Sequence, residues 1–154
     1  MSYVESNLMK GEEIIATGKV HWWIFSRGAF CAFFGILLAI FSDANTPGTV
    51  IGWFMVFIGA IALLNAAIYT FTTELALTNK RIIAKFGLIR RRTIELTHKN
   101  VESLGVNQSI FGRLLNFGSI RIYGTGGSKA PIRRISAPLE FRMKANDIIE
   151  AEQR

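Results

Sequence analysis

The sequence predicts an α-helical membrane hairpin joined to a small, mainly β domain that ends in a helix. Three observations lead to this fold class. Two long apolar runs lie in the first half of the chain, short stretches of alternating apolar and polar residues follow, and an amphipathic segment closes the chain. The mean hydropathy of +0.31 is positive, which is unusual for a soluble protein.

The apolar runs at residues 22–41 and 50–71 each have the roughly 20 residues that a helix needs to cross the hydrocarbon layer. The first contains one charge, Arg27, close enough to its start for the side chain to reach the headgroups. The second contains no charge, and Asn65 is its only strongly polar residue. Residues 42–49 between them are rich in turn formers, so we expect two antiparallel transmembrane helices.

The distribution of basic residues predicts the orientation of this hairpin. The link between the two runs carries Asp43 and no basic residue, whereas Lys and Arg occur on both flanks. Because basic residues favour the inner side, both termini should be cytoplasmic. We therefore expect a multi-pass protein of the cell (inner or plasma) membrane, with an N-terminal cytoplasmic segment at residues 1–21, the hairpin at 22–71 and a cytoplasmic domain at 72–154.

An alternative interpretation makes the first apolar run a signal peptide, because Ser42 and Ala44 offer small residues at a cleavage position. The segment before the run is long and contains Glu5, Glu12 and Glu13, whereas the start of a signal peptide is short and positively charged. We prefer the hairpin.

After Thr73 the pattern predicts five or six strands and one helix. Residues 109–116 are too short for a full helix and should form a turn or a single helical loop. Pro138 suits the first position of a C-terminal helix ending near Gln153, with an apolar stripe formed by Phe141, Ala145, Ile148 and Ile149. Residues 13–17 could add a strand or lie along the membrane. The clearest strand segments are 81–86, 90–96, 101–106, 120–123 and 132–135.

Four stretches carry a resemblance to a known family: ELALTNKRIIAKFGL at residues 74–88, NVESL at 100–104, QSIFGRLLNFGSI at 108–120 and GTGG at 124–127. They resemble the bacterial pleckstrin-homology (PH) family of the second type. This resemblance implies a PH-like barrel with a C-terminal helix, attached to a pair of membrane helices. It assigns no particular function, since that family has no general activity assigned.

Residues 72–154 hold 15 basic and 7 acidic side chains, an excess of 8 that attracts anions. In PH domains, basic residues around the loop between the first two strands hold lipid headgroups. By this resemblance, the predicted lipid-binding residues are Lys85, Arg90, Arg91 and Arg92, although arginines beside a membrane helix can also serve topology alone. A second basic patch, at Arg121, Arg133 and Arg134, is better explained as a solvated face.

The sequence contains no recognisable catalytic or metal-binding pattern. Cys31 is the only cysteine and lies in the first apolar run, which excludes an intrachain disulfide. Neither His21 nor His98 has a second ligand at metal spacing. We therefore expect no enzyme and no cofactor. Nucleic-acid binding is disfavoured because Tyr123 is the best of few candidates for base stacking.

These patterns together predict a membrane-anchored binding module. Its partners would be the bilayer itself, anionic lipid headgroups, or another membrane protein held through an exposed strand edge. The alternative is a subunit or scaffold of a larger membrane protein complex.

Overall fold

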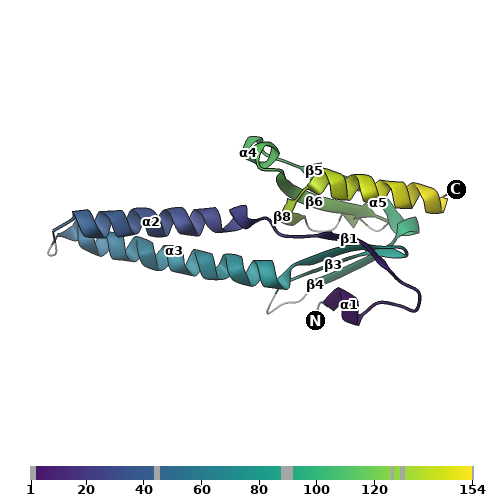
Figure 1. The fold of residues 1–154 in the computed structure, drawn as a ribbon, viewed down its shortest axis with the longest axis horizontal. Helices are drawn as coiled ribbons and strands as arrows, with labels where there is room; N and C mark the ends of the chain where they lie inside the picture. Colours follow the sequence, from purple (N-terminus) through teal and green to yellow (C-terminus); the bar gives the residue numbers. More distant parts are fainter. Residues whose placement is uncertain (1–2, 44–45, 88–91, 126, 129–130, 154) are drawn as a thin grey trace. The chain divides into compact units, whose positions relative to one another are not determined.

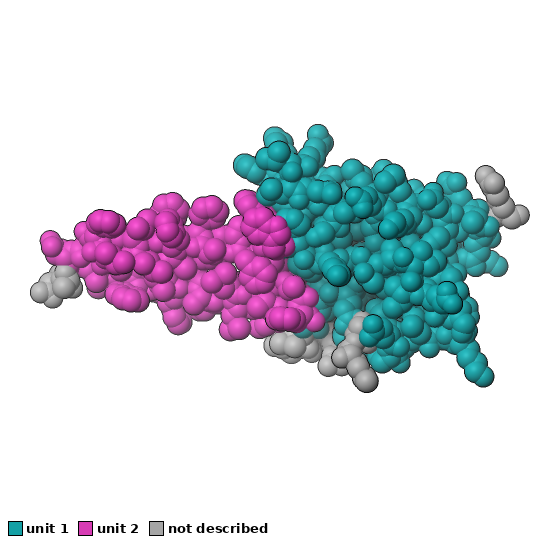
Figure 2. Space-filling view, in the orientation of Figure 1, with its two compact units in different colours: residues 1–21, 72–154 teal, residues 22–71 magenta. Residues whose placement is uncertain are grey.

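The computed structural model describes residues 3–43, 46–87, 92–125, 127–128 and 131–153. The chain divides into two compact units, which Figure 2 shows in different colours: Met1–His21 with Thr72–Arg154, and Trp22–Phe71. We call the first the β domain and the second the helical hairpin. The β domain is therefore discontinuous in sequence, and the helical hairpin is an insertion within it.

The helical hairpin consists of the 3-10 turn η1 (Trp22–Phe25) and the helices α2 (Ser26–Phe41) and α3 (Pro47–Thr72), as Figure 1 shows. Helix α3 begins before the predicted position 50, because Pro47 suits the first turn of a helix. The turn before it is held at Asp43, whose carbonyl oxygen accepts hydrogen bonds from the hydroxyls of Thr46 (2.8 Å) and Thr49 (2.7 Å).

Small residues line the contact between α2 and α3. A Cβ added to Gly35 would lie 2.7 Å from the carbonyl oxygen of Gly52, and one added to Gly59 would lie 2.7 Å from the nitrogen of Ala32. The helix backbones can approach this closely only because these side chains are absent or small. Large apolar side chains point away from the contact, and Phe57 is 62% exposed.

Among the described residues, two helical segments are long and apolar enough to cross a membrane: Trp22–Phe41, with a mean hydropathy of 2.0, and Pro47–Thr72, with 2.2. Only 17% of the residues in each apolar window are buried. The core helix of a soluble domain is mostly buried, so the low burial of these two helices differs from that of a core helix.

The described part of the β domain forms two antiparallel sheets of four strands each. The first has the order β1-β2-β3-β4; in the second, β6 pairs with β5, β7 and β8. The strands are β1 (Ile14–Gly18), β2 (Glu74–Thr78), β3 (Arg81–Phe86), β4 (Arg92–Thr97), β5 (Val101–Asn107), β6 (Phe117–Gly124), β7 (Gly127–Ser128) and β8 (Ile132–Ser136).

The N-terminal segment, which the sequence left open, joins the two sheets. Its strand β1 pairs with β2 in the first sheet, with Gly18 opposite Leu75. The chain then continues to the second sheet, where Val20 bridges Ile135 and the Ser136 amide donates to the carbonyl oxygen of residue 19 at 2.8 Å. Residues on the N-terminal side of the hairpin are thus part of the same fold as those after it.

A short helix, α1 (Tyr3–Ser6), precedes β1 and covers the outer face of the first sheet. Its Val4 is buried together with Ala76 and Ile83, and Leu8 and Ile14 pack against this small cluster. Ile83 therefore has an apolar partner on the face opposite the main core.

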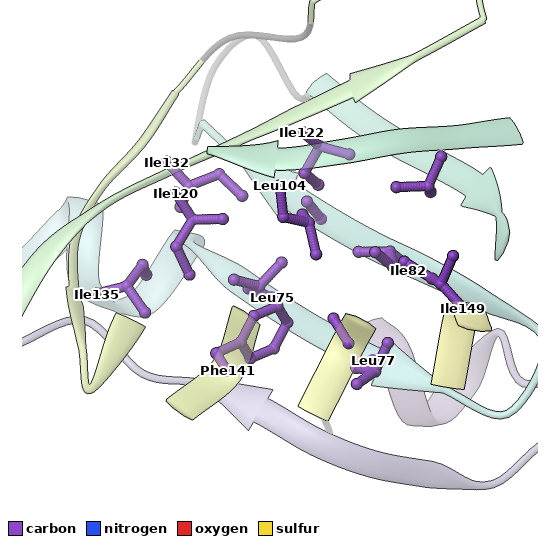
Figure 3. Packing of buried hydrophobic residues seen from close by; sticks show 13 residues of the cluster. Leu75, Leu77, Ile82, Leu104, Ile120, Ile122, Ile132, Ile135, Phe141 and Ile149 are labelled. Carbon is purple, nitrogen blue, oxygen red and sulfur yellow. The ribbon is translucent and has the colours of Figure 1, made fainter. Parts of the chain in front are cut away.

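The C-terminal helix α5 (Pro138–Gln153) packs on the core between the sheets, as Figure 3 shows. Phe141, Ala145 and Ile149 are buried and Ile148 packs against them, which confirms the predicted apolar stripe. The same core contains Leu75, Leu77, Ile82, Ala84, Val101, Leu104, Ile120, Ile122, Ile132 and Ile135 from the strands. Burying each large side chain stabilises the domain by about 1.5–3 kcal/mol.

Most predicted strands are present, with changed ends. The strand predicted at 120–123 begins earlier, at Phe117, and the described part of the one predicted at 90–96 is Arg92–Thr97. Gly127–Ser128 forms a two-residue strand too short for any pattern to reveal. The predicted helical loop at 109–116 contains the helix α4 (Ile110–Leu114), and a 3-10 turn, η2 (His98–Asn100), joins β4 to β5. Two antiparallel sheets with a C-terminal helix are consistent with a PH-like fold.

Candidate functional site

Strand register gives the first sheet two distinct ends. The chain leaves the sheet after Gly18 toward the hairpin and returns from it at Glu74. Lys85, near the end of β3, pairs with Glu74, and Arg92, which opens β4, pairs with Phe86. The end of β1, the start of β2, the end of β3 and the start of β4 therefore share one end of the sheet.

The second sheet meets the hairpin connection at the corresponding end. The amide of His21, the residue directly before the hairpin, donates to the carbonyl oxygen of Arg134 at 2.6 Å. Its ring stacks on Phe117 with 5.1 Å between centroids, and burial lowers the pKa of this imidazole. We call this end of both sheets the helix-connected end, and the opposite end the far end.

Lys85 lies at the helix-connected end, where other groups of the domain engage its ammonium. Its Nζ is 3.7 Å from Oε1 of Glu74 and 4.6 Å from the ring centroid of Tyr3. Its side chain is only 16% exposed. The ammonium thus has both an ionic and a cation–π partner within the fold.

Arg92, the first residue of β4, is exposed at the helix-connected end. Arg90 and Arg91 lie outside the described residues. Two of the four residues predicted to bind lipid therefore lie at one end of the β domain, and their lipid contact stays a prediction.

Two further exposed basic residues at this end were missed by the sequence reasoning as members of a site. Lys19 follows β1, and Arg113 lies on α4, in the connection between β5 and β6. Acidic residues at or near this end include Glu74, which Lys85 pairs, Glu140 in the first turn of α5, and Glu5 on α1, next to Val4, whose amide donates to Glu74. The position of Lys19 just before an apolar run could have marked it in the sequence as a residue of this site. No sequence feature marked Arg113.

The second basic patch is on the surface of the second sheet. Arg121 and Arg133 are exposed, and Nη1 of Arg121 lies 3.5 Å from the hydroxyl of Tyr123. Arg134 is half-buried and has a φ of +58°, at the point where its carbonyl accepts from His21. Tyr123 is itself half-buried, which limits its use for base stacking.

The far end of the first sheet holds an ionic cluster in which Glu12 and Arg81 are buried and Glu95 is exposed. The Arg81 guanidinium donates from Nε to Glu12 at 2.9 Å, from Nη2 to the same carboxylate at 3.0 Å, and from Nη1 to Glu95 at 2.6 Å. Thr78 adds a hydrogen bond to Glu12 at 2.8 Å. The sequence analysis did not identify this cluster.

The cluster strongly favours the ionised form of Glu12. Burial alone would raise the pKa of its carboxyl group, but the hydrogen bonds from Arg81, the Met9 amide and Thr78, with the positive charge of Arg81, lower it to about 2. The hydrogen bond to Glu12 likewise raises the pKa of Arg81. Because every charge is paired, the cluster fastens the segment before β1 to β3 and offers no free acid or base.

His98 is fully buried in the η2 turn. Its Nε2 donates to the carbonyl oxygen of Thr78 at 2.9 Å, and its Nδ1 is buried without a hydrogen-bond partner. Within the described ranges, no group of three His, Cys, Asp or Glu residues is arranged to hold a metal ion.

An open hollow lies between β5 and α5. It is lined by Glu102, Ser103, Leu104, Arg142, Asn146, Ile149 and Glu150. In the described part of the chain, β5 pairs only with β6, so its other edge is an unpaired strand edge beside this hollow. Such an edge can accept an extended segment.

The family model for the bacterial PH domain matches residues 31–147. This chain belongs to the bacterial PH domain family. The match begins inside α2 and ends inside α5, so it includes most of the helical hairpin as well as β2 to β8. No curated protein and no solved structure matches the chain. Membership indicates a binding module and names neither a lipid nor a partner.

Proposed function

We propose that this protein is a membrane-anchored, non-catalytic binding module whose β domain engages anionic lipid of its own membrane. One observation carries the proposal. Exposed basic residues, among them Lys19, Arg92 and Arg113, lie at the end of the β domain from which the chain passes into two apolar helices. An anionic leaflet attracts each such residue by about 1 kcal/mol.

The dimensions and the surface of the hairpin support membrane insertion. At 1.5 Å per residue, the 20 residues of Trp22–Phe41 and the 26 of Pro47–Thr72 span about 30 and 39 Å, against a hydrocarbon layer of roughly 30 Å. Exposed phenylalanines suit lipid and not water. A signal-peptide interpretation would remove β1, which pairs with β2, and Val20, which bridges Ile135 of β8.

The interrupted fold also supports a topology. Residues before and after the hairpin form one folded unit, so both must be on the same side of the membrane. The positive-inside rule assigns that side to the cytoplasm.

Single cysteines on a Cys31→Ala background test this topology. Asp43→Cys should react with an impermeant maleimide on intact cells, and Lys99→Cys only after permeabilisation. The reverse pattern would refute the topology.

Lipid binding is best tested with the β domain freed from its anchor. Residues 72–154 alone would lack β1, so a short Gly-Ser turn should replace residues 22–71 and keep residues 1–21. We expect this variant to bind vesicles containing anionic lipid, to ignore neutral vesicles, and to release with rising salt.

A charge-matched pair of variants makes the test specific. Changing Arg90, Arg91 and Arg92 to Ala should weaken vesicle binding by about 100-fold, at about 1 kcal/mol for each residue. Changing Lys10, Lys80 and Lys99 to Ala removes the same charge from the far end and should have a much smaller effect. Equal losses would mean that net charge alone attracts the membrane, and no binding to anionic vesicles at low salt would refute the proposal.

The edge of β5 favours a second candidate function, capture of an extended segment of a membrane-protein partner, as in a subunit or scaffold. Glu102, Leu104 and Arg142 in the hollow offer one apolar and two charged contacts. A Glu102→Arg variant, which changes an exposed residue of the hollow, should then lose a partner that co-purifies in mild detergent, whereas the Arg90–Arg92 variant should keep it. Purification of the wild-type protein without any partner would count against this function.

A further inference from the structure

Helix α4 exposes three large apolar side chains. Ile110 is 85% exposed, Phe111 64% and Leu114 80%. All three lie on this five-residue helix, which is part of the connection between β5 and β6. The exposed Arg113 lies among them. Single exposed apolar residues are common on protein surfaces, but a group this dense on one short segment marks a surface that is covered in use.

The segment that carries these side chains is well ordered by its own hydrogen bonds. The hydroxyl of Ser109 caps α4 by accepting from the Gly112 amide at 3.1 Å. The side-chain amide of Gln108 donates to the carbonyl oxygens of Gly112 at 3.3 Å and Phe117 at 3.2 Å. A Cβ on Gly112 would lie 2.6 Å from the Phe117 oxygen, so α4 packs its backbone side against β6. Its apolar side chains are therefore directed outward by a defined local structure.

The position of α4 in the fold indicates what covers it. The segment leads directly into Phe117, whose ring stacks on His21, the last residue before the hairpin. Leu114 is three residues from Phe117, which limits their Cα separation to about 11 Å. The neighbouring Asn116 also accepts from the Ala137 amide at 2.9 Å. Figure 1 shows α4 at the end of the second sheet where α5 begins, which is the helix-connected end.

We propose that Ile110, Phe111 and Leu114 insert into the lipid interface of the membrane in which the hairpin is anchored. This inference rests on the proposed membrane anchor and adds a second, apolar attachment of the β domain. Large apolar side chains beside an arginine that can extend to the phosphates suit the boundary between headgroups and acyl chains. The occupant is lipid and not a protein partner, because the basic residues at the same end favour an anionic surface.

Fluorescence with an environment-sensitive label tests the insertion in the full chain, reconstituted in vesicles of neutral and anionic phospholipid. A Cys31→Ala background carries a single labelled cysteine at one of three positions: Leu114→Cys in α4, Phe57→Cys in the hairpin, or Lys99→Cys at the far end. Nitroxides attached to lipids, either near the headgroup or deep in the acyl chain, then quench the labels by depth. Ile110→Cys repeats the α4 measurement if Leu114→Cys does not fold.

We expect the α4 label to be quenched several-fold more by the shallow nitroxide than the label at residue 99, and less by the deep nitroxide than the label at residue 57. Quenching at residue 57 without quenching at residue 114 would overturn the insertion of α4 while leaving the anchor intact. An α4 label that is shielded from water yet not quenched by lipid would mean a protein covers α4, and would also overturn it. No quenching at residue 57 would refute the membrane anchor itself.

Discussion

The helical hairpin and the β domain distribute apolar volume in opposite ways. In the hairpin, Gly35 and Gly52 lie at the helix contact and Phe57 points outward with 62% exposure. In the β domain, Ile82 and Ile120 are fully buried. A water-soluble domain gains stability by removing large apolar groups from water, whereas lipid gives no such gain and leaves close backbone packing to hold helices together. The two distributions are those expected for a hairpin surrounded by lipid and a domain surrounded by water.

A second contrast lies within the β domain, between its two ends. The far end holds the Arg81 guanidinium between two carboxylates, whereas the helix-connected end leaves Arg92 and Arg113 exposed. The charge of Arg81 at the far end is therefore used in folding. The charges of Arg92 and Arg113 at the other end are exposed to solvent.

The largest effect is expected at Arg81. An Arg81→Met variant would leave the carboxylate of Glu12 buried without its partner, which should lower the free energy of unfolding by about 3–5 kcal/mol. Chemical denaturation followed by circular dichroism measures this. Arg121→Met removes an exposed arginine and should change stability by less than about 0.5 kcal/mol. Similar losses in both variants would contradict the contrast between buried and exposed charge.

The next largest effect compares the same type of truncation in the two regions. Ile120→Ala creates a cavity in the fully buried core and should cost about 2–5 kcal/mol. Phe57→Ala removes a larger side chain from the outer surface of α3. In detergent, it should lower the free energy of unfolding by less than half as much as Ile120→Ala does. Thermal unfolding of the two purified variants checks this order, and a costlier Phe57→Ala would mean that the outer face of α3 is packed against protein.

Acid should weaken the β domain through Glu12. Its folded-state pKa is about 2, against an ordinary value of 4.5, so its ionisation stabilises the fold above about pH 4.5 and this contribution is lost as the pH falls toward 2. The loss is on the order of 3 kcal/mol, since one pKa unit corresponds to about 1.4 kcal/mol. Denaturation midpoints between pH 6 and 2.5 measure it. The Glu12→Gln variant should be less stable at neutral pH and show a shallower acid slope; an unchanged slope would assign the acid sensitivity to other carboxylates.

A smaller effect is expected at the helix contact. Gly35→Val would place side-chain atoms against the Gly52 carbonyl and the Val56 amide, and should destabilise the hairpin by about 1–3 kcal/mol. Phe34→Val, at the neighbouring outward position with 54% exposure, is the matched control. Thermal aggregation in detergent should begin at a lower temperature for Gly35→Val only.

Local patterns predicted the features that depend on nearby residues. The two apolar helices, the C-terminal helix with Phe141 and Ile149, and the strands around Ile82 and Ile120 all follow from hydrophobic spacing. Family resemblance then indicated a PH-like fold, and the family match agrees with it.

The features that the sequence did not reveal all depend on distant pairings. Strand β1 meets its partner β2 across the whole inserted hairpin, and no local signal fixes such a pairing. Glu12 and Arg81 are 69 residues apart in sequence. Burial of His98 likewise depends on Thr78 from another strand. At the candidate site, Lys85 could be named from the sequence, but its engagement by Glu74 and Tyr3 could not.

The most direct test of whether the helix-connected end binds anionic lipid is amide hydrogen exchange of the full chain in nanodiscs. The exchange is compared between nanodiscs of neutral lipid and nanodiscs that contain anionic lipid. At moderate salt, we expect slower amide exchange in anionic nanodiscs for peptides covering residues 85–93 and 109–116, and unchanged exchange at the η2 turn of the far end. Identical exchange in both lipids throughout the β domain would contradict lipid engagement by this end.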